Sequence, residues 1–174
     1  MKILETKRLI LRLVTETDAE FILDQLNQPS FIEFIGDRGV RTVEGARNYI
    51  ETRFVKSYED NGYSLYLVEL KESSTPVGLC GFVKRDTFSD PDIGFAFLPQ
   101  FGGKGYAVES ARGVMKYGHD VLKLERVLAI TTQDNESSGR LLEKIGFAFE
   151  RLIEMPPDNE VLKLFVFPSQ NRER

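Results

Sequence analysis

Bulky apolar residues alternate strictly with small ones in one stretch of the chain, between Asp92 and Phe97. Every second residue there is bulky and apolar, and the residues between are small or, at Asp92, acidic. This alternation predicts a β-strand with one bulky face and one small face. Pro99 cannot donate to a sheet ladder and ends the strand. Glycines at 102, 103 and 105 then lead into helical apolar spacing from Tyr106 onward. The pattern therefore predicts a strand, a glycine-rich turn and a helix in succession.

The residues before this unit carry three strand patterns and two helix patterns. Apolar alternation and helical spacing predict strands at 8–14, 63–70 and 77–84, and helices at 19–26 and from 42 to about 60. The last two strands form a hairpin around the turn at 73–76. The segment Phe31–Gly39 is ambiguous, because its apolar run suits either a short helix or a loop.

After the helix that starts at Tyr106, the chain predicts one strand, one helix and a closing strand pair. These lie at 126–132, 135–145, 147–155 and 161–167. Asn135 suits a helix N-cap, and Gly146 suits a helix C-terminus. The polar tail Gln170–Arg174 is expected to fray. Hairpins combined with crossovers predict an α/β (α+β) fold, in which one sheet has antiparallel and parallel parts.

The composition is that of a soluble globular protein, and the length of 174 residues favours a single domain over 1–174. A net charge of −4 argues against a nucleic-acid partner, which usually needs a basic face. One cysteine excludes a disulfide framework and a multi-cysteine metal site. The chain has no signal-peptide pattern and no apolar run long enough for a membrane span, so we expect a cytoplasmic protein without metal or membrane partner.

Glycine-rich turns that open a helix suit phosphate, because the unpaired N–H groups and the partial positive charge of the helix face the ligand. A P-loop needs Lys followed by Ser or Thr, whereas Gly105 follows Lys104 here. A dinucleotide fingerprint needs Gly or Ala at its third glycine position, whereas Val108 stands there. Both of these phosphate sites are therefore disfavoured, and with the second a nicotinamide or flavin oxidoreductase.

The pattern Gln100-x-x-Gly103-x-Gly105 resembles the acyl-CoA-binding signature of the GNAT family of N-acetyltransferases. Its extension through Tyr106-Ala107-x-Glu109-x-Ala111, the helix pattern Asn135-x-x-Ser138 and the opening Thr6-x-Arg8-Leu9-x-Leu11-Arg12 are similar to the branch that acetylates ribosomal-protein N-termini. The resemblance covers nearly the whole chain. It implies a mixed, mostly antiparallel sheet of about seven strands flanked by about four helices.

The resemblance implies an acyltransferase that takes its acetyl group from acetyl-CoA. The N–H groups of Gly103, Gly105, Tyr106 and Ala107 are expected to converge on the pyrophosphate. Lys104 is either a phosphate contact or a solvated lysine. The pantetheine arm is expected along the small face of the strand, bonded to the backbone near Phe97 and Leu98. Asn135 is a candidate pantetheine or phosphate contact as well as a helix cap.

Transfer to an amine needs a base, because a lysine-like amine has a pKa of about 10.4 and is protonated at neutral pH. Asp92 is the candidate base, since it lies on the predicted strand at the end away from the phosphates, and Glu33 is the reserve. Many relatives protonate the leaving thiolate with a tyrosine that this chain lacks. The resemblance indicates Ser138 instead.

Two reactive residue types are set aside. His119 lies fourteen residues beyond Gly105 on the same helix, about 20 Å away, and Cys80 is the kind of lone strand cysteine that packs in a core. We therefore expect direct attack on acetyl-CoA by a primary amine, either a protein N-terminus or a small molecule, in a monomer or homodimer. A CoA-binding regulatory module that kept the fold and lost turnover remains the alternative.

Overall fold

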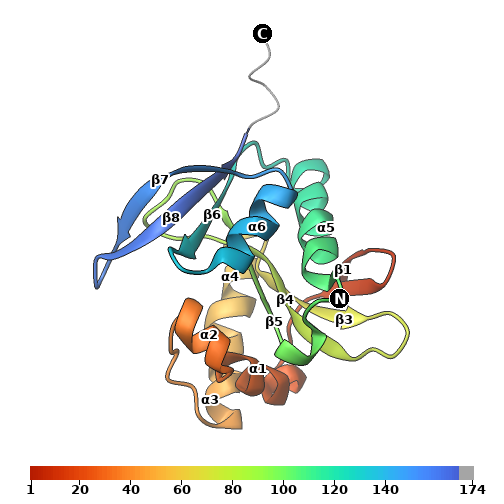
Figure 1. The fold of residues 1–174 in the computed structure, drawn as a ribbon. Coiled ribbons are helices and arrows are strands. Elements are labelled where there is room, and N and C mark those ends of the chain that lie inside the picture. The colour runs from red at the N-terminus through yellow and green to blue at the C-terminus, as the bar shows by residue number, and fades with distance from the viewer. Residues whose placement is uncertain (169–174) are drawn as a thin grey trace.

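One mixed sheet organises the protein, and its eight strands lie in the order β1-β2-β3-β4-β5-β6-β8-β7 within residues 1–168, the part of the chain that the computed structural model describes (Figure 1). The polar tail Gln170–Arg174 lies outside these residues. The strands are β1 Lys2–Glu5, β2 Leu9–Arg12, β3 Leu65–Leu70, β4 Pro76–Val83, β5 Asp92–Phe97, β6 Val127–Thr132, β7 Ala148–Met155 and β8 Glu160–Phe167.

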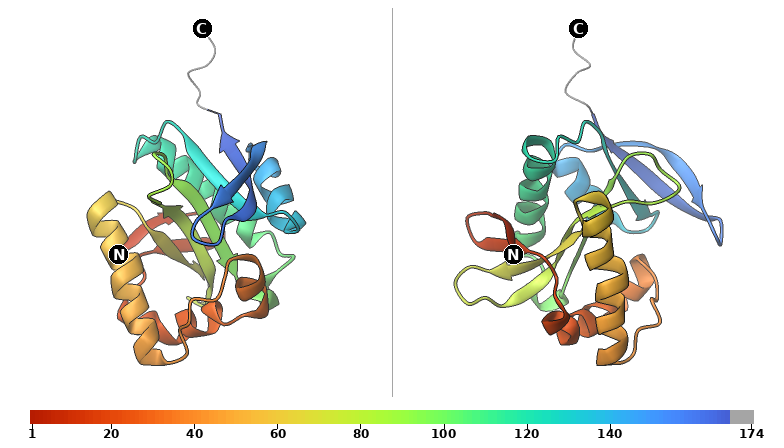
Figure 2. Two further views of the ribbon diagram at one scale, coloured as in Figure 1. Left: turned by 90° about the vertical axis from the view of Figure 1, so that its left-hand side faces the viewer. Right: turned by 180° about the vertical axis from the view of Figure 1, so that it is seen from behind.

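Helices lie on both sides of this sheet (Figure 2). They are α1 Ala19–Leu26, α2 Pro29–Phe34, α3 Val43–Tyr49, α4 Lys56–Asn61, α5 Tyr106–Asp120 and α6 Glu136–Lys144. A π-helical segment, η2 Ile50–Val55, joins α3 to α4, and short 3-10 turns lie at η1 Glu16–Asp18 and η3 Pro99–Phe101. Gly62, in the left-handed conformation, ends α4.

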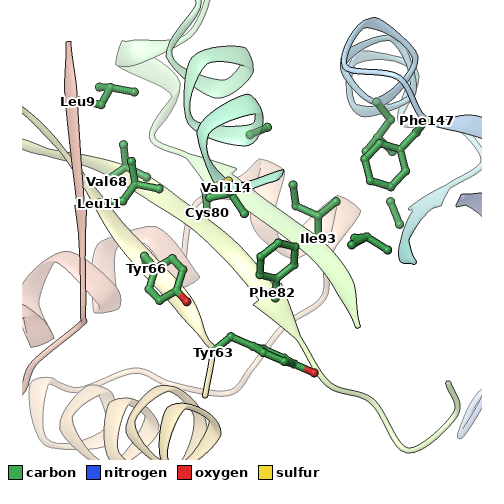
Figure 3. Close-up of a cluster of buried hydrophobic side chains, with 14 of the residues drawn as sticks. Leu9, Leu11, Tyr63, Tyr66, Val68, Cys80, Phe82, Ile93, Val114 and Phe147 are labelled. Carbon is green, nitrogen blue, oxygen red and sulfur yellow. The ribbon is translucent and has the colours of Figure 1, made fainter. Parts of the chain in front are cut away.

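Alternate residues of the central strands feed two separate cores. Tyr66 and Phe82 belong to the core cluster that also contains Val114 of α5 (Figure 3). Leu67 and Leu79 lie on the opposite face of the sheet and pack against α1, α2 and α3. Period-two alternation thus buries both faces of the sheet, as expected for strands covered by helices on both sides.

The sequence predicted this architecture, and the structure adds one strand at the edge. Lys2–Glu5 forms β1, which pairs antiparallel with β2. The ambiguous segment Phe31–Gly39 divides into the end of α2 and an irregular stretch. The helix predicted from Thr42 to Asp60 is continuous from Val43 to Asn61, with the π-helical segment in its middle.

The sheet comes apart between β5 and β6. Every other neighbouring pair is antiparallel, whereas β5 and β6 run parallel and the described register joins them at one pair, Asp92 with Leu128. Beyond that pair the two strands part and open a gap inside the sheet. The helices that follow them, α5 and α6, lie beside the gap.

Candidate functional site

A hollow of about 420 Å³ lies at the open end of this gap. It is bounded by the end of β5, the glycine-rich turn, the first turn of α5 and one face of α6. The lining residues are Phe97, Phe101, Gly102, Gly103, Gly105, Tyr106, Ala107, Val108, Ser137, Arg140, Leu141 and Lys144. The predicted turn residues Gly103, Gly105, Tyr106 and Ala107 are therefore brought together around one cavity.

The glycine turn has a backbone that other residues rarely adopt. Gly103 has φ +73° and Gly105 has φ +81°, both in the left-handed region that favours glycine. Gly105 is the N-cap of α5, and its carbonyl accepts the first helical bond, from the N–H of Glu109. The N–H groups of the first turn, which start at Tyr106, have no carbonyl partner within the helix. They make the hollow a favourable place for an anionic group.

One edge of β5 faces the gap with its backbone groups. The N–H of Leu98 donates to the carbonyl of Val77, which makes these two a hydrogen-bonded pair of the β4–β5 ladder. Because such pairs alternate in an antiparallel ladder, the N–H and C=O groups of Phe95 and Phe97 point away from β4. The parting of β6 leaves this edge of β5 open toward the hollow.

The backbone of Leu98 is bonded within the protein. Its carbonyl accepts from the N–H of Phe101, and its N–H donates to the carbonyl of Val77. Gly94 and Ala96 belong to the side of the sheet that packs against Leu65 and the helices α1 and α3. The small face of β5 is therefore turned away from Phe97 and the hollow.

Asp92 lies at the closed end of the gap, about 17 Å along β5 from Phe97. Its side chain is 1% exposed, and Oδ1 lies 3.0 Å from Nε of Arg85. Burial raises the pKa of Asp92, while the positive charge of Arg85 opposes the rise. Burial and the nearby charge of Asp92 in turn raise the pKa of Tyr63, which keeps that phenol neutral.

The structure also places the four other residues predicted for the site, which are Asn135, Ser138, Lys104 and Glu33. Asn135 caps α6, since its Oδ1 accepts the N–H of Ser138 at 3.2 Å. Ser138 is half-buried in the first turn of α6, and its hydroxyl makes no hydrogen bond to another described residue. The ammonium of Lys104 lies 5.8 Å from the ring centre of Phe101. Glu33 is exposed on α2, the helix whose Phe31 packs in the core with α1 and α3.

Sequence reasoning missed the face that α6 turns toward the hollow. Ser137, Arg140, Leu141 and Lys144 line it, and their spacing of three and four residues places them on one side of a helix. Two of them are basic, which suits an anion. Arg140 and Lys144 are four residues apart in the sequence, and this helical spacing could have been used to predict the basic face.

The profile of the "Acetyltransferase (GNAT) domain" matches residues 8–148, most of the chain. The chain belongs to the GNAT acetyltransferase family. It is 32% identical over 152 residues to the uncharacterized N-acetyltransferase YoaA of Bacillus subtilis, which covers 87% of this chain and 85% of that protein. A GNAT acetyltransferase of Bacillus anthracis superposes with a TM-score of 0.76 at 28% identity, covering 95% and 96% of the two chains.

The ribosomal L7/L12 α-N-protein acetyltransferase RimL, solved in complex with coenzyme A, superposes with a TM-score of 0.82 at 16% identity. The match covers 95% of this chain and 97% of that one. At this identity the likeness shows the fold alone. GNAT enzymes use acetyl-CoA, and the predicted sheet and helices of the family are confirmed.

The two residues set aside from the acetyltransferase chemistry lie apart from the hollow. Cys80 is fully buried in the core beneath α5, and burial raises the pKa of its thiol to about 12. His119 is exposed near the far end of α5, next to Asp120. Within residues 1–168 no cluster of three or more acidic, histidine or cysteine side chains is arranged to hold a metal. No described helix combines the length and apolarity that crossing a bilayer requires.

Proposed function

We propose that this GNAT protein transfers the acetyl group of acetyl-CoA to a primary amine by direct attack in a ternary complex. The observation that carries the proposal is the parting of β5 from β6, which leaves an open backbone edge between the hollow and Asp92. A long, jointed ligand with a phosphate end, an amide-bearing arm and a reactive end matches this succession. One end of β5 would then bind the phosphates, and the other end would place the reacting group.

The residues present fit acetyl-CoA at the phosphate end. Gly103, Gly105, Tyr106 and Ala107 line the hollow where the first-turn N–H groups of α5 are free. Arg140 and Lys144 add positive charge from α6. Lys104, beside Phe101, is a further candidate for a phosphate, and Asn135 orders the first turn of α6 by capping it.

The arm of the cosubstrate would follow the edge of β5 rather than its small face. The backbone of Phe97 points to the gap, whereas Gly94 and Ala96 point to the α1–α3 side. A pantetheine arm carries amides that can bond to such an edge as a neighbouring strand does. Phe97 is thus the proposed contact, and Leu98 acts by holding the end of β5 to Val77.

Acetyl-CoA supplies the acetyl group as an activated thioester. Asp92 would accept the proton of the incoming amine, directly or through water, and burial supports this role because it raises the pKa of the carboxyl toward that of a useful base. Ser138 would donate a proton to the departing thiolate, and its hydroxyl is not used by another described residue. Glu33 remains the reserve base, on the exposed side of α2.

Direct attack agrees with the state of the one cysteine. Cys80 is fully buried, and the rise of its pKa to about 12 keeps the thiol protonated. A nucleophilic cysteine needs thiolate and access. The proposal therefore has no acetyl-cysteine step, and trapping acetylated Cys80 would contradict it.

A CoA-binding module without turnover is the competing proposal, and one observation favours it. The candidate base is 1% exposed and already paired with Arg85, so an amine reaches Asp92 only if water or a rearrangement links them. A module would bind acetyl-CoA at the hollow and transfer nothing. This class of protein would use the fold to sense the cosubstrate.

One experiment separates the two proposals. Acetyl-CoA binding is measured by calorimetry, and acetyl transfer is screened across polyamines, amino acids, aminoglycosides and peptides with free N-termini. Binding with transfer to at least one amine supports the enzyme, and binding with no transfer supports the module. No binding of acetyl-CoA contradicts both.

A further inference from the structure

The turn between β1 and β2 reaches the glycine turn through one arginine. The backbone N–H of Arg8 donates to Oε1 of Glu109, and Nε of Arg8 donates to Oε2, each at a distance of 2.7 Å. The hydroxyl of Thr6 donates to the same carboxylate, also at a distance of 2.7 Å. Glu109 lies in the first turn of α5. Three bonds to one carboxylate therefore tie the N-terminal turn to the start of this helix.

The same arginine holds the peptide group just before α5. Nη1 of Arg8 donates to the carbonyl of Lys104 at 2.9 Å, and the guanidinium lies 4.5 Å from the ring centre of Tyr106. Nη2 lies so close to Gly105 that a Cβ there would meet it at 3.2 Å. Arg8 is therefore fixed by Glu109 on one side and covers Lys104, Gly105 and Tyr106 on the other.

Fixing the Lys104 carbonyl also fixes the direction of the next N–H group. The peptide bond between Lys104 and Gly105 is trans and planar, so its C=O and N–H point in opposite directions. The carbonyl points to Arg8, outside the hollow. The N–H of Gly105 therefore points away from Arg8, on the side where Gly105 lines the hollow.

A glycine turn needs such an anchor. Glycine adopts positive and negative φ with similar ease, so a peptide beside Gly105 can rotate at small cost when nothing holds its carbonyl. In the unanchored turn the Gly105 N–H would sample directions away from the ligand, and binding would have to restore one of them. An ordered turn avoids that loss of affinity.

We propose that Arg8 is a positioning residue for acetyl-CoA, which acts by holding the Lys104–Gly105 peptide so that the Gly105 N–H faces the hollow. Glu109 completes the device by orienting the guanidinium. The proposal rests on the assignment of the hollow to acetyl-CoA. Arg8 itself does not line the hollow, so it affects the ligand through the turn.

The test compares Arg8→Gln, Arg8→Lys and Glu109→Gln with a matched control, Arg47→Gln. Arg47 also pairs with a carboxylate, that of Glu44, and its side chain is 51% exposed against 43% for Arg8, but it lies on α3. Circular dichroism identifies the temperature range in which each variant is folded. Acetyl-CoA affinity is then measured by calorimetry in that range, and kcat and KM are measured with any amine the protein accepts.

Arg8→Gln is expected to weaken acetyl-CoA binding about tenfold, the effect of one lost charge-assisted hydrogen bond, and to raise KM for acetyl-CoA while kcat at saturation stays unchanged. Glu109→Gln should act in the same direction, and the double variant should be no weaker than the worse single variant because both belong to one device. Arg8→Lys should recover part of the affinity, and Arg47→Gln should bind as the wild type does. Wild-type affinity, within twofold, in folded Arg8→Gln would overturn the proposal.

Amide exchange in the free protein separates this proposal from the assignment of the hollow. Arg8→Gln should speed hydrogen exchange in peptides that span residues 102–108, and Arg47→Gln should not. If the wild type fails to bind acetyl-CoA, the proposed function fails, and faster exchange still identifies Arg8 as the anchor of the turn. Unchanged exchange in Arg8→Gln would show that the turn does not depend on Arg8.

Discussion

The Nε of Arg85 lies 3.0 Å from Oδ1 of Asp92 at the point where β5 and β6 begin to part. The carboxylate is buried and the arginine is about one-third exposed. Burial favours the protonated carboxyl and the arginine favours the charged form. The balance between them decides at which pH Asp92 can accept a proton.

Replacing Asp92 by Asn should lower kcat by about 100-fold or more, the usual contribution of a general base. Asn has nearly the same shape but cannot accept the proton, and the glycine turn proposed to bind acetyl-CoA is at the other end of β5, so KM for acetyl-CoA should change little. Steady-state kinetics at saturating amine measures both constants. Undiminished kcat in a folded Asp92→Asn protein would remove Asp92 from the mechanism, and loss of kcat in Glu33→Gln instead would promote the reserve base.

Replacing Arg85 by Gln should move the acid limb of the kcat profile to higher pH. The positive charge of Arg85 lowers the pKa of Asp92, so its removal lets burial raise that pKa further. Protonated Asp92 is inactive as a base, and activity should therefore be lost at a higher pH than in the wild type and recover on the alkaline side. The measurement is kcat from pH 5 to 9.

Arg126→Gln is the control for this shift. Arg126 pairs with Asp90 and Glu150 in the same region, and none of its ion pairs involves Asp92. Its removal changes the local charge by the same amount and should leave the acid limb nearly where it was. Equal shifts in both variants would mean that the limb reports the general charge of this end of the sheet.

Replacing Gly105 by Glu should abolish acetyl-CoA binding. The new side chain would occupy the turn, meet Arg8 and place a negative charge beside the first-turn N–H groups of α5. Gly62→Glu is the control, because Gly62 has φ +78°, ends α4 and has open space around it. Both variants should lose about 1 kcal/mol of unfolding free energy, because residues other than glycine are strained in the left-handed conformation. Their melting temperatures should therefore fall by similar amounts, whereas calorimetry should show loss of acetyl-CoA binding only in Gly105→Glu.

The two serines in the first turn of α6 should have separable effects. Ser138→Ala should lower kcat if its hydroxyl protonates the thiolate, with little change in KM. Ser137→Ala should act on KM for acetyl-CoA, because Ser137 lines the hollow. A drop in kcat for Ser137→Ala with normal turnover of Ser138→Ala would exchange the two assignments.

The order of strands and helices could be predicted because each long element carries its own periodicity. The strand Asp92–Phe97 alternates clearly, and α5 begins at Tyr106 where the helical spacing begins. Strand β1 was missed because Lys2–Glu5 is four residues long and gains its place by pairing with β2. The π-helical segment Ile50–Val55 leaves the apolar pattern nearly intact and so gives no separate signal.

The parts of the candidate site that depend on residues close together in the sequence could be predicted. The parts that depend on contacts between distant residues could not. The turn residues around Gly105 were found because their spacing is local. The bonds from Arg8 to Glu109 span 101 residues, and the sequence carries no sign that these two side chains meet. Likewise, Asp92 could be selected as a carboxylate, but its burial and its pairing with Arg85 required the folded structure.

The fact that only one described residue pair joins β5 to β6 also has a thermodynamic consequence. A ligand along the open edge of β5 would bridge the two halves of the sheet and bind the folded chain but not the unfolded one. Saturation at 100 times its dissociation constant would add about 2.7 kcal/mol to the free energy of unfolding. The lifetime of the protein in a cell would then follow the supply of its own acetyl donor.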